Sequence, residues 1–118
     1  KIITIFFLVY SWNFTALTNN LVGIVPQNIV KYVIASIATA IDYLHSNKIV
    51  YRNLNSVDII ITQKGNVVIT DFSCAKLLGS EGKTNTLIGI PYYMAPEMIK
   101  NSEYTYNVDI WSMGIILY

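Results

Sequence analysis

The chain has 118 residues, a formal net charge of +1 at neutral pH and 53% hydrophobic residues. This near-neutral balance gives no electrostatic case for binding nucleic acid, which is recognised through basic patches. The single cysteine, Cys74, excludes an internal disulfide and fits a reducing, cytoplasmic compartment.

The first apolar segment, residues 2–9, is rich in β-branched and aromatic residues and predicts a buried strand. It is too short to cross a bilayer, which needs about 20 apolar residues. The longer apolar run at residues 29–44 is interrupted by Lys31 and Asp42, so we expect no membrane span. Residues 15–21 predict a short helix or a loop.

An amphipathic helix is predicted after Pro26, because proline can open a helix at its first turn. Apolar residues then recur at helical spacing: Val30, Val33, Ile34, Ile37, Ala38, Ile41 and Leu44. Such a stripe is typical of a helix packed on a core. The helix leads into a strand at residues 49–51. We expect a structural role for His45 at the end of the helix.

Two short apolar runs, residues 59–62 and 67–70, predict a β-hairpin with Gly65 in its turn. Asp58 and Asp71 stand just outside the two ends of this hairpin. The hairpin therefore directs both carboxylates toward one spot, which is the geometry that a site for metal and phosphate needs.

The chain becomes polar and glycine-rich after Phe72, notably at residues 79–83, which predicts a mobile segment. Residues 94–100 predict a short helix, and residues 101–107 predict a loop. The final segment, from residue 108 onward, is apolar nearly all round and predicts a buried helix.

Four motifs together resemble those of the protein kinases. Residues 51–58, with the following apolar strand, resemble the catalytic loop [HY]-R-D-L-K-x-x-N. Residues 71–73 resemble the metal-binding D-F-G, residues 89–97 resemble G-T-P-x-Y-x-A-P-E, and residues 108–114 resemble the D-x-W-S-x-G start of the long central helix. Four matches in the family's order and spacing are very specific.

The resemblance implies an α+β, protein kinase-like fold that is partial, with the hinge strand and the first part of the mainly helical C-lobe. Residues 1–118 would form part of one domain of roughly 250 residues. We expect the N-lobe and the terminal C-lobe helices elsewhere in the parent protein. Tyr51 and residues 83–89 are similar to the corresponding residues of the cyclic-nucleotide-dependent Ser/Thr kinases. This resemblance makes cyclic-nucleotide domains possible elsewhere in the parent protein.

Three positions depart from the catalytic pattern. Asn53 stands where the family has the aspartate that accepts the substrate hydroxyl proton, and an amide cannot act as a base. Asn55 replaces the lysine that stabilises charge on the transferring phosphate, leaving only a dipole. Ile90 replaces the threonine that braces both groups. Because these changes affect one mechanism, we interpret them together as a loss of phosphoryl transfer.

The metal positions are better preserved. Asp71 is retained, and Asp58 replaces the metal-ligand asparagine, so the two could hold magnesium, which prefers oxygen ligands. Mg-ATP is thus a possible, weak cofactor, with Ile60 among the apolar residues beneath the adenine. The alternative is that the two acids only cap the hairpin. Ser73, in place of the D-F-G glycine, restricts backbone movement.

A phosphorylation switch is also implied by the resemblance. Thr86 occupies the activation-loop phosphosite, and Arg52 and Lys76 match the basic residues that would hold its phosphate. The alternative is that Arg52 binds backbone carbonyls and Thr86 is an ordinary loop residue.

Three hypotheses of function follow from these positions. The first is a pseudokinase that acts as a scaffold or regulatory binding domain with protein partners. The second is a weak or unconventional ATP-dependent Ser/Thr kinase that uses Asp58 and Asp71 for Mg-ATP. The third is a purely structural block that binds no nucleotide.

Overall fold

A computed structural model describes residues 12, 13, 15 and 25–118. Its longest element is helix α2, Gln27–Ser46, which begins directly after Pro26 as predicted. Val33, Ile37 and Ile41 recur every four residues and are all buried, so the apolar stripe faces the core. The helix ends at Ser46, and the backbone N–H of the next residue, Asn47, donates to carbonyl groups of the last turn.

Two small antiparallel sheets pack beside this helix. The first has the order β1-β3-β4 and contains β1 (Trp12–Asn13), β3 (Ile59–Ile61) and β4 (Val67–Ile69). The predicted hairpin is confirmed, because β3 and β4 pair with Ile59 opposite Ile69, and Gly65 in the turn has a φ of +82°. The second sheet pairs β2 (Ile49–Val50) with β5 (Lys76–Leu77).

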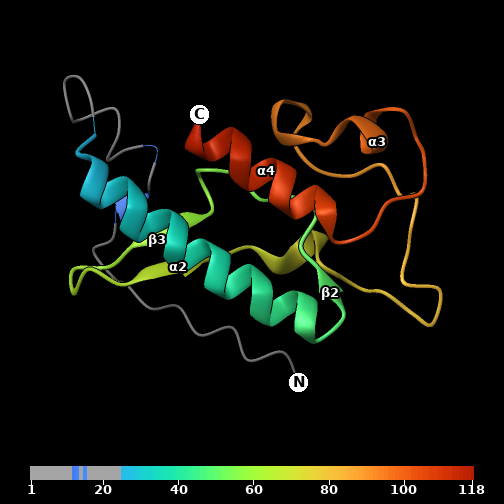
Figure 1. Ribbon diagram of the computed structural model, residues 1–118, viewed down its shortest axis with the longest axis horizontal. Coiled ribbons are helices and arrows are strands. Elements are labelled where there is room, and N and C mark those ends of the chain that lie inside the picture. The colour runs from blue at the N-terminus through green and yellow to red at the C-terminus, as the bar shows by residue number, and fades with distance from the viewer. Residues whose placement is uncertain (1–11, 14, 16–24) are drawn as a thin grey trace.

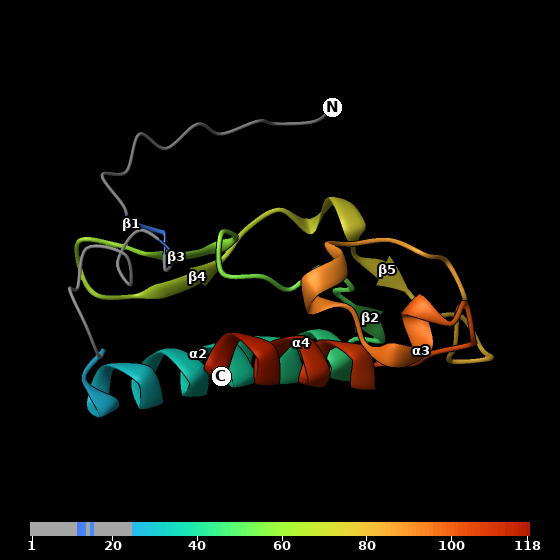
Figure 2. The same cartoon turned by 90° about the horizontal axis from the view of Figure 1, so that it is seen from above.

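Short elements connect these sheets to a second long helix. Two 3-10 turns, Phe72–Cys74 and Pro91–Tyr93, precede and follow the long segment after β5. Helix α3, Pro96–Ile99, lies within the predicted short helix, and α4 spans Asn107–Leu117. Helices α2 and α4 lie side by side in one layer, with the β1-β3-β4 sheet in the other (Figures 1 and 2).

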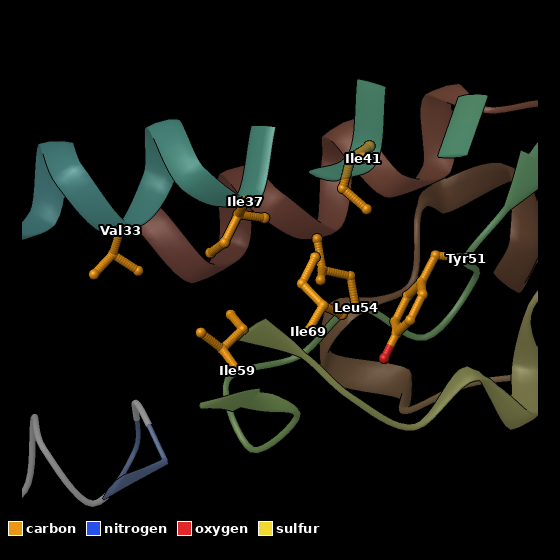
Figure 3. Packing of buried hydrophobic residues seen from close by; sticks show 7 residues of the cluster. All are labelled: Val33, Ile37, Ile41, Tyr51, Leu54, Ile59 and Ile69. Carbon is orange, nitrogen blue, oxygen red and sulfur yellow. The ribbon is translucent and has the colours of Figure 1, made fainter. Parts of the chain in front are cut away.

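Two clusters of buried side chains form the core. The larger cluster lies between α2 and the hairpin, and Figure 3 shows its seven residues converging from both layers: Val33, Ile37, Ile41, Tyr51, Leu54, Ile59 and Ile69. The smaller cluster joins β2 to α3 and the start of α4: Val50, Leu78, Ala95, Met98, Tyr104 and Val108. The loop after β2 therefore connects the two clusters.

The expectation that the last helix is wholly buried is wrong for the described structure. Helix α4 buries Val108, Asp109 and Ser112 on one face, whereas Trp111 is 46% exposed on another. The apolar composition of residues 108–118 correctly indicated a helix. It did not identify which face contacts α2, because apolar residues occur on every side.

The predicted strand at residues 2–9 lies outside the described residues, as does all of the predicted element at 15–21 except Thr15. Within the described part of the chain, no helix is long and apolar enough to cross a membrane.

Candidate functional site

One buried carboxylate holds the loop that follows β2 in place. Asp109, on the first turn of α4, accepts hydrogen bonds from the backbone N–H groups of Tyr51 and Arg52, each at 2.8 Å. Its Oδ2 also lies 2.8 Å from Nε2 of His45, at the end of α2. His45 therefore has the structural contact expected of it, and three segments meet at Asp109.

Tyr51 ties the same loop to the end of the hairpin. Its hydroxyl donates to the backbone carbonyls of Thr70 and, at 3.1 Å, of Asp71. Burial raises the pKa of Tyr51 well above its ordinary value, and the negative charges of Asp58 and Asp71 raise it further. Because the hydroxyl contacts the backbone carbonyls of Thr70 and Asp71, the loop is joined to the residues that follow β4.

Asn53 has a side-chain contact across the site. Its Oδ1 accepts a hydrogen bond from the backbone N–H of Ile90 at 3.0 Å. Gly89, just before, has a φ of +112° and lies so close that a Cβ there would be 2.9 Å from the carbonyl oxygen of Arg52. The degenerate base position and the degenerate threonine position are therefore joined, through the amide of Asn53 and the backbone of Ile90.

Asn55 lies inside the loop and is 1% exposed. Its Nδ2 donates to the Asn53 carbonyl at 2.8 Å and to Oδ2 of Asp58 at 2.5 Å. Its Oδ1 accepts from the N–H groups of Val57 and Asp58 at 2.9 and 3.2 Å. A side-chain amide has two donor hydrogens and two acceptor lone pairs, so all its positions are used. It has no free hydrogen for a phosphate.

Asp58 and Asp71 occupy neighbouring positions at the open end of the hairpin. The carbonyl of Asp58 accepts from the backbone N–H of Thr70, at 2.9 Å, and Asp71 follows directly. Asp71 is exposed, and hydrogen bonds from the side chain and backbone of Ser73 lower the pKa of its carboxyl. It is therefore ionised at neutral pH.

This pair of carboxylates fits magnesium in its chemistry. Magnesium usually keeps several waters and takes one or two carboxylates together with substrate phosphates. The hydrogen bond from Asn55 uses only one of the lone pairs of the Asp58 carboxylate, so its second oxygen can still bind a cation. The described residues hold no group of three or more acidic, histidine or cysteine side chains that would suit a dedicated metal cage.

Ile60, predicted to lie beneath an adenine, is in the middle of β3 and is half-buried. It is opposite Val68 in β4 and Asn13 in β1. Its neighbour Ile59 belongs to the buried cluster against α2. Because side chains alternate across a strand, Ile60 lies on the other face of the sheet from that cluster.

The predicted switch residues are arranged around a threonine that sequence reasoning did not single out. Lys76 Nζ donates to Oγ1 of Thr84 at 2.8 Å, and that oxygen lies 3.4 Å from Oγ1 of Thr86. Thr84 is buried and pairs with Tyr104 through two backbone hydrogen bonds. The structure thus brings Lys76 and Thr86 together, with Thr84 between them.

Arg52 is also buried, with its Nε donating to the Cys74 carbonyl at 2.6 Å. Among the described residues, its Nη1 is buried without a hydrogen-bond partner. Its φ of +71° is unusual for a residue with a side chain and is held by the bond from its N–H to Asp109. The contact with the Cys74 carbonyl agrees with the backbone-binding alternative for this arginine.

A second contact was missed at the sequence level. The Ser56 hydroxyl lies 3.0 Å from that of Tyr93 and accepts from Thr15 Oγ1 at 2.7 Å. These residues are far apart in the chain, and no pattern of spacing indicates their meeting. The turn role of Asn55, in contrast, had a local signal: an asparagine can bond the backbone N–H two residues on.

Comparison with known proteins places this site in a family. The family model described as "Protein kinase domain" matches residues 6–118. The cGMP-dependent protein kinase of Plasmodium berghei is 42% identical over 96 residues, which is 81% of this chain and 11% of that protein. Human cGMP-dependent protein kinase 2 is 42% identical over 88 residues, covering 75% of this chain and 12% of that protein.

Similarity extends to other Ser/Thr kinases. The Serine/threonine-protein kinase shk2 of Schizosaccharomyces pombe is 44% identical over 78 residues, which is 65% of this chain and 13% of that protein. The chain therefore spans only about a tenth of the length of the curated relatives it matches.

Proposed function

This chain belongs to the protein kinase domain family, with Ser/Thr kinase relatives, and we propose that it is a pseudokinase segment. In this proposal it is impaired in phosphoryl transfer and acts as a scaffold or regulatory binding domain within a larger, intracellular protein. Its partners would be proteins, and an N-lobe and cyclic-nucleotide domains would lie elsewhere in that protein.

The observation that carries the proposal is the contact between Asn53 Oδ1 and the backbone N–H of Ile90. The position that would accept the substrate proton holds a neutral amide, and its oxygen is already an acceptor within the fold. General-base catalysis contributes about 10²–10⁴-fold to a rate. Asn53 therefore has a structural contact at the position where the chemistry of the family needs a base.

The neighbouring positions support the same proposal. Asn55 supplies no cation, and its amide hydrogens are both used within the loop. Ile90 has an aliphatic side chain, which cannot brace a base and a lysine as a threonine hydroxyl would. Electrostatic stabilisation of the transferring group is a principal source of catalysis in phosphoryl transfer, so its loss adds to that of the base.

Transfer of labelled phosphate from Mg-ATP to serine- and threonine-containing peptides by the full-length protein tests this proposal. We expect the wild-type rate to equal that of an Asp71→Ala variant, because neither has the groups for transfer. A matched Asp42→Ala variant, which removes an exposed carboxylate on α2, controls for the change of charge. Transfer that is present in the wild type and in Asp42→Ala, but lost in Asp71→Ala, would contradict it.

That contradicting result would support a second candidate function, a weak or unconventional ATP-dependent Ser/Thr kinase. The observation in its favour is the exposed carboxylate of Asp71, which directly follows Thr70, the residue whose N–H bonds the carbonyl of Asp58. When bound there, magnesium would neutralise phosphate charge. Asp71 and Asp58 would hold the ion, and Ile60 would contribute an apolar surface for the base of the nucleotide.

Regulation by phosphorylation at Thr86 is compatible with both candidate functions. The proximity of Lys76, through Thr84, supports it, and Arg52 is the second cation that the resemblance assigns to the phosphate. A phosphate there would add negative charge close to the exposed Lys76, which reaches Thr86 through Thr84. In a scaffold, this change would adjust the surface of the segment between β5 and α3 without altering a rate of transfer.

A further inference from the structure

The side chain of Asn55 has two separable roles in the loop. Its Oδ1 accepts from the N–H groups of Val57 and Asp58 and so closes the turn. Its Nδ2 donates at 2.5 Å to Oδ2 of Asp58, which is a contact with a carboxylate and not with the backbone of the turn. The turn needs only the oxygen, because an Asx turn is closed by the acceptor alone.

The bond from Asn55 Nδ2 helps to fix the position of the Asp58 carboxylate, because the backbone of Asp58 is also held. The backbone N–H of Asp58 is held by Asn55, and its carbonyl accepts from both the N–H and the hydroxyl of Thr70, at 2.9 and 3.1 Å. With Oδ2 also bonded to Asn55, the carboxylate has little freedom to rotate. Its second oxygen is left without a constraint from Asn55, at the same end of the hairpin as Asp71.

The chemistry of the donor also matters. A neutral amide orients a carboxylate without cancelling its charge, whereas a cation at the same place would neutralise it. Residues that hydrogen-bond a ligating carboxylate orient it for the metal, and their loss typically lowers metal affinity by about 10–100-fold. A side chain that is 1% exposed and fully hydrogen-bonded is itself held in one position.

We propose that Asn55 is a positioning residue that presets the Asp58 carboxylate for a divalent cation shared with Asp71. The inference rests on the cation site of the second candidate function, and it requires no phosphoryl transfer. The family has a lysine at this position, and this chain has Asn55. In this inference the loop therefore lacks a phosphate-binding cation and instead has a side chain that orients a metal ligand.

Titration of the full-length protein with Mn²⁺, in the absence of nucleotide, tests the inference by electron paramagnetic resonance of the free ion. Manganese suits the same carboxylate and water ligands as magnesium. We expect Asn55→Ala to weaken Mn²⁺ binding by about 10–100-fold. Asn55→Ser should weaken it similarly while keeping the turn, because a serine hydroxyl can accept from the same N–H groups but is too short to reach Asp58.

An Asp58→Asn variant provides the coupling test, and Asn66→Ala, which changes an exposed asparagine in the hairpin turn, provides the matched control. If Asn55 acts through Asp58, adding Asn55→Ala to Asp58→Asn should cause no further loss of affinity. Thermal melting of each variant identifies those that fold.

Unchanged Mn²⁺ affinity in a folded Asn55→Ser or Asn55→Ala variant would overturn the inference, since a purely structural asparagine would affect melting alone. Failure of the wild type to bind Mn²⁺ would also overturn it. Neither result would affect the proposed loss of phosphoryl transfer, which is measured separately with labelled ATP.

Discussion

Replacing Asp109 with alanine is expected to lower the free energy of unfolding by about 3–5 kcal/mol, in line with removing one partner of a buried charged contact. The side chain of Asp109 is 0% exposed and bonds the backbone N–H groups of Tyr51 and Arg52 as well as His45. Its loss would leave two buried backbone donors unpaired, and each such donor costs about 1–3 kcal/mol. It would also remove the hydrogen bond that holds the backbone of Arg52 at a positive φ.

Urea unfolding of the full-length protein, followed through the transition of the domain that contains this chain, measures the effect. Asp109→Asn should be less harmful than Asp109→Ala, because one carbonyl oxygen can still accept. Asp42→Ala removes an exposed carboxylate from α2 and should leave the midpoint nearly unchanged. An Asp109→Ala midpoint equal to that of Asp42→Ala would show that the loop does not depend on this anchor.

Replacing Gly89 with alanine should have the second large effect on stability. The φ of +112° strains a residue with a side chain by about 1–3 kcal/mol. The new Cβ would also lie 2.9 Å from the carbonyl oxygen of Arg52 and 3.3 Å from Oδ1 of Asn53. Since Asn53 Oδ1 accepts from the next residue, Ile90, the substitution would separate the loop from the segment that begins at Gly89.

Gly79→Ala is the matched control, because a methyl group added at Gly79 would meet no neighbouring atom within 4 Å and the φ there is not strained. Thermal melting of both variants in the full-length protein should give a clear loss for Gly89→Ala and little change for Gly79→Ala. Equal melting temperatures for the two variants would mean that the backbone at Gly89 can move away from Arg52 at no cost.

The parts of the fold that sequence predicted well are those with a strong local pattern. Val33, Ile37 and Ile41 lie at helical spacing, and they indicated both helix α2 and the face it buries. The hairpin had two β-branched runs and a glycine between them, and it also placed Asp58 and Asp71 at one end. Periodicity and turn chemistry determine such elements locally.

Other features depend on contacts between distant segments. The bonds from Asn53 to Ile90 and from Ser56 to Tyr93 join residues 37 positions apart in each case. Motif matching identified Asn53 as a degenerate base, but it did not predict the contact that its oxygen makes. For helix α4, an apolar sequence on every face left the buried side undetermined until α2 was in place.

Hydrogen exchange measured by mass spectrometry tests the central claim most directly, namely that the polar groups of the loop hold the fold together without a ligand. Peptides covering residues 50–58 and 88–94 of the full-length protein would be followed with and without Mg-ATP. We predict slow exchange without nucleotide, little change on adding it, and faster exchange at 88–94 in Asn53→Ala. Rapid exchange that becomes slow only with Mg-ATP would contradict the account.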